Sequence, residues 1–435
     1  MTGPRARAGD LWPLALMRER AGQQSAEAEV VRPQSFEEVA AILRDGRRVV
    51  PRGGGSGVCG ALDPGAGDLV LDLAALDRWE VDEENLTVRA QAGLNGRELE
   101  RRLNERGLTL GHYPSSLPSA TVGGLISTSS SGQQSTLYGN VEDMVVGLTV
   151  ALPGGEVAWA RDHPRSAAGP PLHHLFVGAE GGLGVVLEAI LRVHRLPEAV
   201  VGRAWRVPGV AEGLPVLREV MQSGLRPLVL RLYDPEDSLL QGLDGGCLLL
   251  AASAGLRPLA DAEAVLLAQL VEGEPLGEEP WARWLRHRFD LSADRLLDLL
   301  EPAGAYVDTI EVAATWSRLP ALYAEVKGHL GGLGGLALCH FSHAYPQGCC
   351  AYFTFAGSEA DEERARAAYA EAWRGTMEIA LRHGATISHH HGVGQVRAPW
   401  IRTELGGWWT VWQRVREALD PDHRLNPHAV GGRER

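Results

Sequence analysis

The feature that most constrains the fold is a glycine-rich segment, Pro51-Arg-Gly-Gly-Gly-Ser-Gly-Val-Cys-Gly60, which follows a predicted strand at 48–51. Glycine accepts positive φ, so successive backbone N–H groups in such a loop can converge on one anion. The segment therefore predicts a loop that approaches a ligand closely, and a diphosphate is a natural occupant. A flexible glycine turn without a ligand is the alternative interpretation.

Three of these residues, Gly55, Gly57 and Gly60, match the G-x-G-x-x-G pattern of Rossmann dinucleotide-binding domains. That pattern requires a helix to begin within the loop. Here further turn residues follow the loop, and then a second predicted strand at 69–73. We therefore reject the Rossmann interpretation.

Composition limits the remaining choices. A chain of 435 residues exceeds one ordinary core, so we expect at least two domains. The net charge of -13 argues against nucleic acid or an anionic membrane surface as partner. No apolar run approaches the length of a membrane span, and the first residues lack the apolar core of a signal peptide. We expect a cytoplasmic protein without a transmembrane segment. Its substrate would be a small molecule or lipid-like, and a homodimer is one assembly that it could form.

Cysteine usage agrees with that location. The five cysteines are odd in number and show no C-x-x-C spacing, which favours reduced thiols over a disulfide framework.

Hydrophobic periodicity predicts an α+β protein with a domain at 24–196, a second domain at 197–375 and a C-terminal segment at 376–435. In the first domain, Ser35 and Glu38 form a capping box before a helix. Other elements predicted there are strands at 86–92, 144–151, 156–159 and 184–193 and a helix at 94–106. The second domain alternates strands and helices, which suggests an antiparallel sheet with helices on one face. Its predicted strands are 202–207, 227–233, 246–252, 305–312 and 350–356, and its helices are 210–223, 258–272 and 316–329. We expect further helices at 361–382 and 406–419.

Two more segments of the first domain favour close approach of backbone to a ligand. Residues 113–140 are rich in small and hydroxyl side chains, and Gly178-Ala-Glu-Gly-Gly-Leu-Gly-Val-Val186 is rich in glycine. Three such segments in one domain suit a large, extended cofactor.

In order and spacing, these three segments resemble the FAD-binding domain of the vanillyl-alcohol-oxidase superfamily, over about residues 30–196. The resemblance implies that the first loop cradles the pyrophosphate and that the other two enclose the rest of FAD. The implied cofactor-binding residues are Arg52, Gly53, Gly54, Gly55, Ser56, Gly57, Val58, Ser115, Ser116, Leu117, Pro118, Ser119, Ala120, Thr121, Leu125, Ile126, Ser127, Thr128, Glu180, Gly181, Gly182, Leu183, Gly184, Val185 and Val186. Some members attach FAD through a His just after the glycines. Ser56 and Gly57 stand there in this chain, so we expect non-covalent FAD.

The most unusual string in the second half is Ser388-His-His-His-Gly-Val-Gly394. Three interpretations compete. A metal site would need further ligands, because only His389 and His391 share a side of an extended segment. A structural cluster beside the glycine turn is the second. Acid–base groups are the third, because imidazoles titrate near neutral pH. Upstream, Cys339 to Phe355 ends in a predicted strand that carries Tyr352, for which packing is the alternative role.

Both strings resemble those of the alkylglycerone-phosphate synthase (alkyl-dihydroxyacetone-phosphate synthase) family. The resemblance implies catalytic roles for Tyr352, Arg231, His389, His390 and His391, and no metal. It also implies a substrate-binding Arg for a phosphate. An ungapped reading places Leu297 at that position, and a two-residue insertion places Arg295 there. Without a bidentate Arg, a phosphate loses a strong charge-assisted contact.

The resemblance implies exchange of the acyl group of acyl-glycerone phosphate for a long-chain alcohol, through an adduct at flavin N5 and without net redox change. Ether-lipid biosynthesis would be its context. The alternative is an FAD-dependent dehydrogenase or oxidase of a 2-hydroxy acid such as D-lactate or glycolate. Several such dehydrogenases carry a metal site of spaced His and Glu residues, which is not recognisable here. A third interpretation is a subunit that binds FAD without catalysis.

Overall fold

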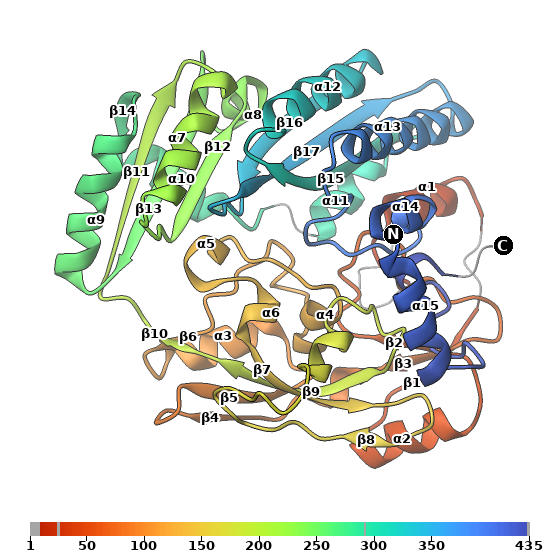
Figure 1. Cartoon of the computed structure of the whole chain (residues 1–435). Coiled ribbons are helices and arrows are strands. Elements are labelled where there is room, and N and C mark those ends of the chain that lie inside the picture. The colour runs from red at the N-terminus through yellow and green to blue at the C-terminus, as the bar shows by residue number, and fades with distance from the viewer. Residues whose placement is uncertain (1–8, 24–26, 291–292, 433–435) are drawn as a thin grey trace. The chain divides into compact units, whose positions relative to one another are not determined.

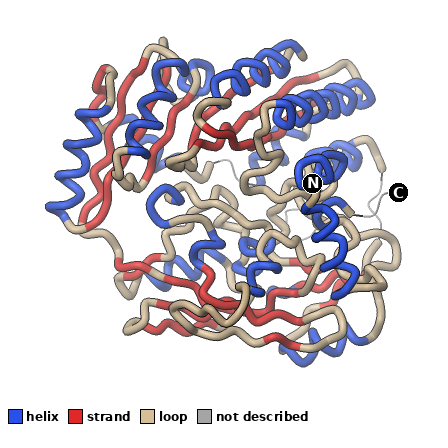
Figure 2. Tube along the Cα trace, in the orientation of Figure 1, coloured by secondary structure: helices blue, strands red, loops and turns tan. Residues whose placement is uncertain are grey.

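The computed structural model describes residues 9–23, 27–290 and 293–432; the beginning of the predicted first domain, 24–26, lies outside them. The chain divides into two compact units. The first unit comprises residues 1–130, 140–195 and 390–435, and the second comprises 131–139 and 196–389. The boundary at 195/196 lies next to the predicted one, and residues 390–435 return to the first unit. The elements of both units are labelled in Figure 1 and coloured by type in Figure 2.

The first unit contains a small parallel sheet and a larger antiparallel one. The parallel sheet has the order β1-β3-β2, built from Glu29–Val31, Leu69–Asp72 and Val49–Arg52. The antiparallel sheet has the order β4-β5-β9-β7-β8, built from Trp79–Asp82, Thr87–Gln91, Val185–Arg192, Val145–Ala151 and Val157–Ala158. A further pair joins β6 (Leu108–Thr109) to β10 (His194–Arg195). The strands predicted in this domain are confirmed.

The glycine loop follows β2, and its helix-free continuation leads to β3, which confirms the rejection of a Rossmann domain. The capping box is also confirmed, because the Glu38 N–H donates to Ser35 Oγ at 3.2 Å and Glu38 Oε2 accepts from the Gln34 N–H at 2.7 Å. The helix it begins is α2 (Phe36–Arg44), and the other helices of this unit are α1 (Pro13–Arg20), α3 (Gly96–Asn104), α4 (Val122–Ser127), α6 (Val141–Met144), α14 (Ala398–Leu405) and α15 (Trp408–Leu419).

The second unit is built on one seven-stranded sheet, and its antiparallel pairing is as predicted. Its order is β14-β11-β13-β12-β16-β17-β15, built from Glu274–Gly277, Ala199–Val207, Cys247–Gly255, Val229–Tyr233, Leu336–Ser342, Gly348–Ser358 and Ala305–Thr315. Its longest pairing joins β15 to β17 over eleven residue pairs. The strands β14 and β16 were not predicted.

Long helices cover one face of this sheet (Figure 1). They are α7 (Val210–Gln222), α9 (Arg257–Leu270), α12 (Leu319–Gly332) and α13 (Glu362–Arg382). Aromatic contacts identify this face: Tyr323 of α12 lies 5.4 Å from Phe341 of β16, and Tyr369 of α13 lies 6.0 Å from Phe355 of β17, ring centre to ring centre.

Helices are not confined to that face. In α10 (Glu279–His287), Trp281 and Trp284 pack with Tyr233, whose chain neighbour Leu232 faces α7. Adjacent residues of a strand point to opposite faces, so α10 lies on the face opposite to α7. Shorter helices of this unit are α5 (Ser135–Tyr138), α8 (Pro235–Leu240) and α11 (Ala293–Leu300).

Candidate active site

In the first unit, the glycine loop packs directly against the second predicted loop. A Cβ on Gly53 would overlap Thr121 Oγ1, and a Cβ on Gly54 would overlap the carbonyl oxygen of Ser119. Only glycine allows so close an approach, so the two loops pack directly against each other.

The third predicted segment joins the other two. The Glu180 N–H donates to the Ser127 carbonyl at 2.8 Å, and the Gly178 N–H donates to the Ile126 carbonyl at 3.0 Å. Gly181, at φ +75°, lies so close to Pro51 that a Cβ there would reach its ring at 3.0 Å. All three segments therefore converge at one place in the first unit.

Thr121 Oγ1 and His112 Nδ1 are buried in this region and have no hydrogen-bond partner among the described residues. The other ring nitrogen of His112 lies 2.7 Å from Ser130 Oγ, and burial lowers the pKa of His112 to about 4. Buried polar atoms normally find partners. Glycine N–H groups next to a buried, unpartnered hydroxyl fit a phosphate-containing dinucleotide, and the residues present thus fit FAD.

Glu180, an expected cofactor-binding residue, uses its carboxylate within the protein. It accepts N–H groups of Val393, Gly394 and Val430, at 2.7 to 3.1 Å. Burial raises the pKa of Glu180. Its side chain thus fastens the C-terminal segment to the third loop, and only its backbone faces the second loop.

Asp10, which the sequence analysis did not single out, holds the end of the glycine loop through hydrogen bonds. Its carboxylate is 4% exposed and accepts the N–H groups of Gly60 at 3.1 Å and Leu62 at 3.4 Å. Burial raises the pKa of Asp10 to about 7.

In the second unit, four side chains form a row across neighbouring strands on the face opposite to α12 and α13. Tyr233 pairs with His340, His340 pairs with Tyr352, and Tyr352 pairs with Glu311 in the strand register. Directly paired residues share a face, so one polar row crosses β12, β16, β17 and β15. Only Tyr352 of this row was predicted.

Tyr352 is partly buried within the row. Its ring stacks on His340, with centres 4.7 Å apart and planes 12° apart. Loss of water raises the pKa of the Tyr352 phenol, and the nearby Glu311 raises it further. The phenol therefore stays protonated at neutral pH. Glu311 is fully buried and accepts a hydrogen bond from Ser388 Oγ at 3.0 Å.

Arg231 lies two residues before Tyr233 on β12 and so shares its face. Its Nε donates to Tyr233 Oη at 3.0 Å, and its guanidinium carbon lies 5.4 Å from the Tyr233 ring centre and 5.6 Å from that of Trp284. Arg231 is only 8% exposed, yet within the described residues no carboxylate forms an ion pair with it. A buried cation without a counter-ion is costly, and an anionic substrate group would relieve that cost.

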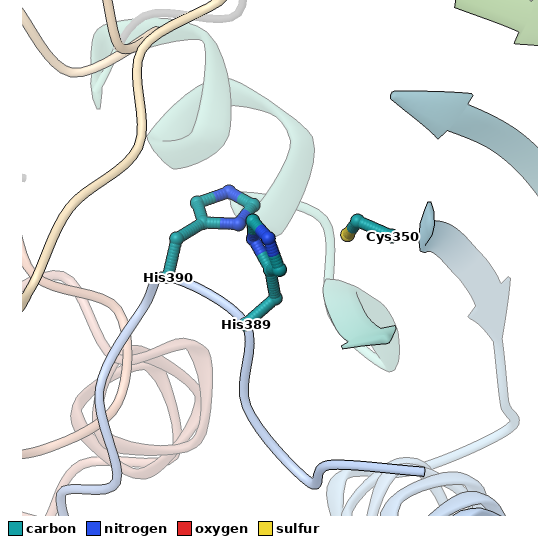
Figure 3. A group of neighbouring side chains, drawn as sticks. All are labelled: Cys350, His389 and His390. Carbon is teal, nitrogen blue, oxygen red and sulfur yellow. The ribbon is translucent and has the colours of Figure 1, made fainter. Parts of the chain in front are cut away.

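The histidine string divides between the units. His389 ends the second unit, where its Nε2 lies 2.8 Å from Tyr345 Oη and its ring centre lies 5.1 Å from that of His343. Figure 3 shows the side chains of His389 and Cys350. A ring nitrogen of His389 and the Sγ of Cys350, both atoms that can bind a metal ion, lie within 4.8 Å of each other. His390 and His391 belong to the first unit.

The other predicted residue of the second unit is Arg295, on α11, and its side chain is exposed. Leu297, the position given by the ungapped reading, is 7% exposed. Alternation along β16 could have placed His340 beside Tyr352, but that strand was not predicted. All five cysteines are buried, and none forms a disulfide within the described residues.

Comparison with known proteins assigns the family. Residues 196–430 match the model of the C-terminal domain of FAD linked oxidases, and residues 28–161 match that of an FAD binding domain. The chain belongs to the FAD-linked oxidases. It is therefore a flavoenzyme and its cofactor is FAD, as predicted.

Two relatives of this FAD-linked oxidase show the range of the family. The chain is 31% identical to the alkyldihydroxyacetonephosphate synthase of Dictyostelium discoideum, over 95% of this chain and 75% of the relative. It is 30% identical to the glycolate oxidase subunit GlcD of Bacillus subtilis (strain 168), over 93% of this chain and 89% of the relative.

A solved structure of a related enzyme has the same fold as this chain. An alkyldihydroxyacetonephosphate synthase superposes on this FAD-linked oxidase with a TM-score of 0.80 at 27% identity, covering 98% of this chain and 81% of the other. The predicted resemblance and fold class are confirmed. No helix within the described ranges has the length and apolar content to cross a bilayer.

Proposed function

We propose that this flavoenzyme exchanges the acyl group of acyl-glycerone phosphate for a long-chain alcohol. The ester C–O bond at C1 breaks, the alcohol oxygen forms the new ether bond, and the fatty acid leaves as a carboxylate with release of one proton. When bound, FAD supplies a ring that accepts an electron pair from the substrate. The glycine loops at 52–58, 115–121, 125–128 and 180–186 would hold it.

The observation that carries the proposal is the placement of Tyr352 and Arg231 on one face of the sheet. Arg231 would bind the departing carboxylate, because it is a buried cation with no carboxylate partner among the described side chains. Tyr352 would move a proton, since its phenol is protonated at neutral pH. His389, His390 and His391 would activate the alcohol, and Arg295 would contact the phosphate.

A second candidate is oxidation of a 2-hydroxy acid. The same observation on Arg231 favours it, because such a substrate presents a carboxylate to a buried guanidinium. The C–OH group becomes C=O: its hydroxyl proton passes to a protein base, the C–H bond on the same carbon breaks, and bound FAD would take up that hydrogen as a hydride with its two electrons.

Two assays separate the candidates. In the first, the enzyme is mixed anaerobically with D-lactate or glycolate and its flavin absorbance is followed. In the second, labelled fatty alcohol is offered with acyl-glycerone phosphate, and label is sought in the ether product. Label incorporation without bleaching supports the exchange. Rapid bleaching by a hydroxy acid without label incorporation would replace it with the oxidation.

We further propose that FAD is bound non-covalently, since Ser56 and Gly57 offer no imidazole. Acid precipitation should leave the yellow cofactor in the supernatant; colour retained by the pellet would contradict this.

A further inference from the structure

Because the Tyr352 phenol is protonated at neutral pH, it can donate a proton but cannot take one from the substrate, so a neighbouring group must be the base. The side chain stacked on it is His340, and His340 has a carboxylate partner of its own. We propose that His340, oriented by Asp237, is the base that takes the substrate's proton on this face. The proposal rests on the proposed function, but it applies to both candidate reactions because each removes one proton from the substrate.

The pair has the geometry of a fixed imidazole. His340 Nδ1 lies 3.2 Å from Asp237 Oδ2, and their side chains are 16% and 10% exposed. A carboxylate at this position holds the proton on Nδ1 and leaves Nε2 with a free electron pair.

Asp237 is itself held in place. It lies on α8, its N–H donates to Asp234 Oδ1 at 2.9 Å, and its Oδ1 accepts from Gln241 Nε2 at 3.3 Å. The first bond holds the backbone of Asp237 in the first turn of α8, and the second holds its carboxylate, whose Oδ2 is directed at the imidazole. A base oriented by a third group is a recurring arrangement in acid–base catalysis.

The charges around His340 favour a base that is neutral before reaction. Burial lowers the pKa of His340, and so does Arg231 on β12, while Asp237 on α8 raises it. The remaining neighbours, Tyr233 and Tyr352, are phenols whose own pKa values are raised. A neutral imidazole can accept a proton at neutral pH, and Asp237 would stabilise the imidazolium that results.

The proton balance is simple. The substrate C–H bond (in the exchange) or O–H bond (in the oxidation) breaks, and an N–H bond forms at Nε2. The electron pair stays on the substrate, and Nε2 later returns its proton to solvent.

The test uses the holoenzyme with His340→Gln and Asp237→Asn. The chain offers a matched control, because His287 Nδ1 and Asp290 Oδ2 form a similar pair, at 2.7 Å, on the surface. We expect His340→Gln to keep its flavin spectrum but lose at least about 100-fold in kcat with little change in KM. The acid limb of its pH profile should disappear. Asp237→Asn should lose less and should move that limb to lower pH, whereas His287→Gln and Asp290→Asn should change neither. A kcat for His340→Gln within twofold of wild type would overturn the proposal.

A second measurement does not depend on turnover. Imidazole resonances of the resting holoenzyme are followed through pH, and the His340 signal is assigned by its loss in His340→Gln. Its midpoint should fall in Asp237→Asn and stay in place in Asp290→Asn. A midpoint that Asp237→Asn leaves unmoved would overturn the pairing. A wild-type enzyme inert toward both substrate classes would instead count against the proposed function, and the titration would still decide the pair.

Discussion

At the residue scale, the packing of the glycine loop depends on the absence of a side chain at its glycine residues. Gly54 lies where any Cβ would overlap the Ser119 carbonyl, so a side chain must push the second loop away. Such a displacement should weaken FAD binding, because both loops would hold the cofactor.

Gly54→Ala should therefore lose most of its bound FAD, measured as the ratio of flavin to protein absorbance after gel filtration. The matched control is Gly328→Ala, in α12, where a Cβ meets no atom within 4 Å. That change should leave FAD bound and stabilise the helix by up to about 1 kcal/mol, because alanine favours helix over glycine. Full flavin occupancy in Gly54→Ala would contradict the packing.

A second residue, Asp10, should make the stability of the first unit depend on pH. The pKa of Asp10 is raised from 3.8 to about 7 by burial, so the folded protein binds its proton more tightly than the unfolded chain does. The resulting stability is fully present below about pH 4 and is lost as the pH rises through 7.

Asp10→Asn removes this titration. The difference in unfolding free energy, wild type minus variant, should fall with rising pH, by up to about 1.4 kcal/mol per unit between pH 4 and 7. Urea unfolding at pH 5, 6, 7 and 8 measures it. Parallel stability curves for the two proteins would show that Asp10 keeps an ordinary pKa.

At the element scale, a buried carboxylate joins a helix to the sheet. Asp308 of β15 is 3% exposed and accepts hydrogen bonds from Tyr369 Oη at 2.7 Å and Trp373 Nε1 at 3.1 Å, both on α13. Leaving two buried donors unsatisfied costs about 1–3 kcal/mol each.

Asp308→Ala should thus lower the free energy of unfolding of the second unit by several kcal/mol, as followed by urea denaturation. Asp298→Ala, at an exposed position of α11, should stay within about 0.5 kcal/mol of wild type. A loss below 1 kcal/mol for Asp308→Ala would mean that the two donors find other partners.

Sequence patterns predicted most of the strands, and the failure to predict β16 has a physical reason. Strands such as β5 and β17 alternate buried and less buried residues, and their boundaries were close to those observed. β16 was missed because Leu336 to Ser342 follows a glycine-rich stretch and does not alternate clearly between apolar and polar residues. His340 was missed with it, since its partners come from β12, β17 and α8 and depend on register rather than on local sequence. Asp10 was missed for a similar reason, because its partners lie some fifty residues further along the chain.

At the scale of the whole molecule, each unit has its own core, and all the residues predicted to bind FAD belong to the first unit. A ligand that binds only the folded state stabilises what it binds. Removing FAD should therefore lower the unfolding temperature of the first unit and leave that of the second nearly unchanged.

Differential scanning calorimetry of holo- and apoenzyme measures this. We expect two transitions, of which one shifts upward with added FAD in proportion to the logarithm of its concentration. Asp308→Ala identifies the other transition, because it should move only that of the second unit. Equal shifts of both transitions on adding FAD would show that the units unfold together.

The chain passes from one unit to the other four times, at 130/131, 139/140, 195/196 and 389/390. On the ribosome, the second unit is therefore complete before residues 390–435 are made, while the first must wait for them. Val393, Gly394 and Val430, which satisfy the buried Glu180 carboxylate, are in that last stretch. Because Val430 follows Glu180 by 250 residues, at about 5–20 residues per second the carboxylate waits roughly 10–50 seconds for its last partner. The third loop therefore gains these contacts only after residue 430 has been made, and we expect stable FAD binding only from that point on.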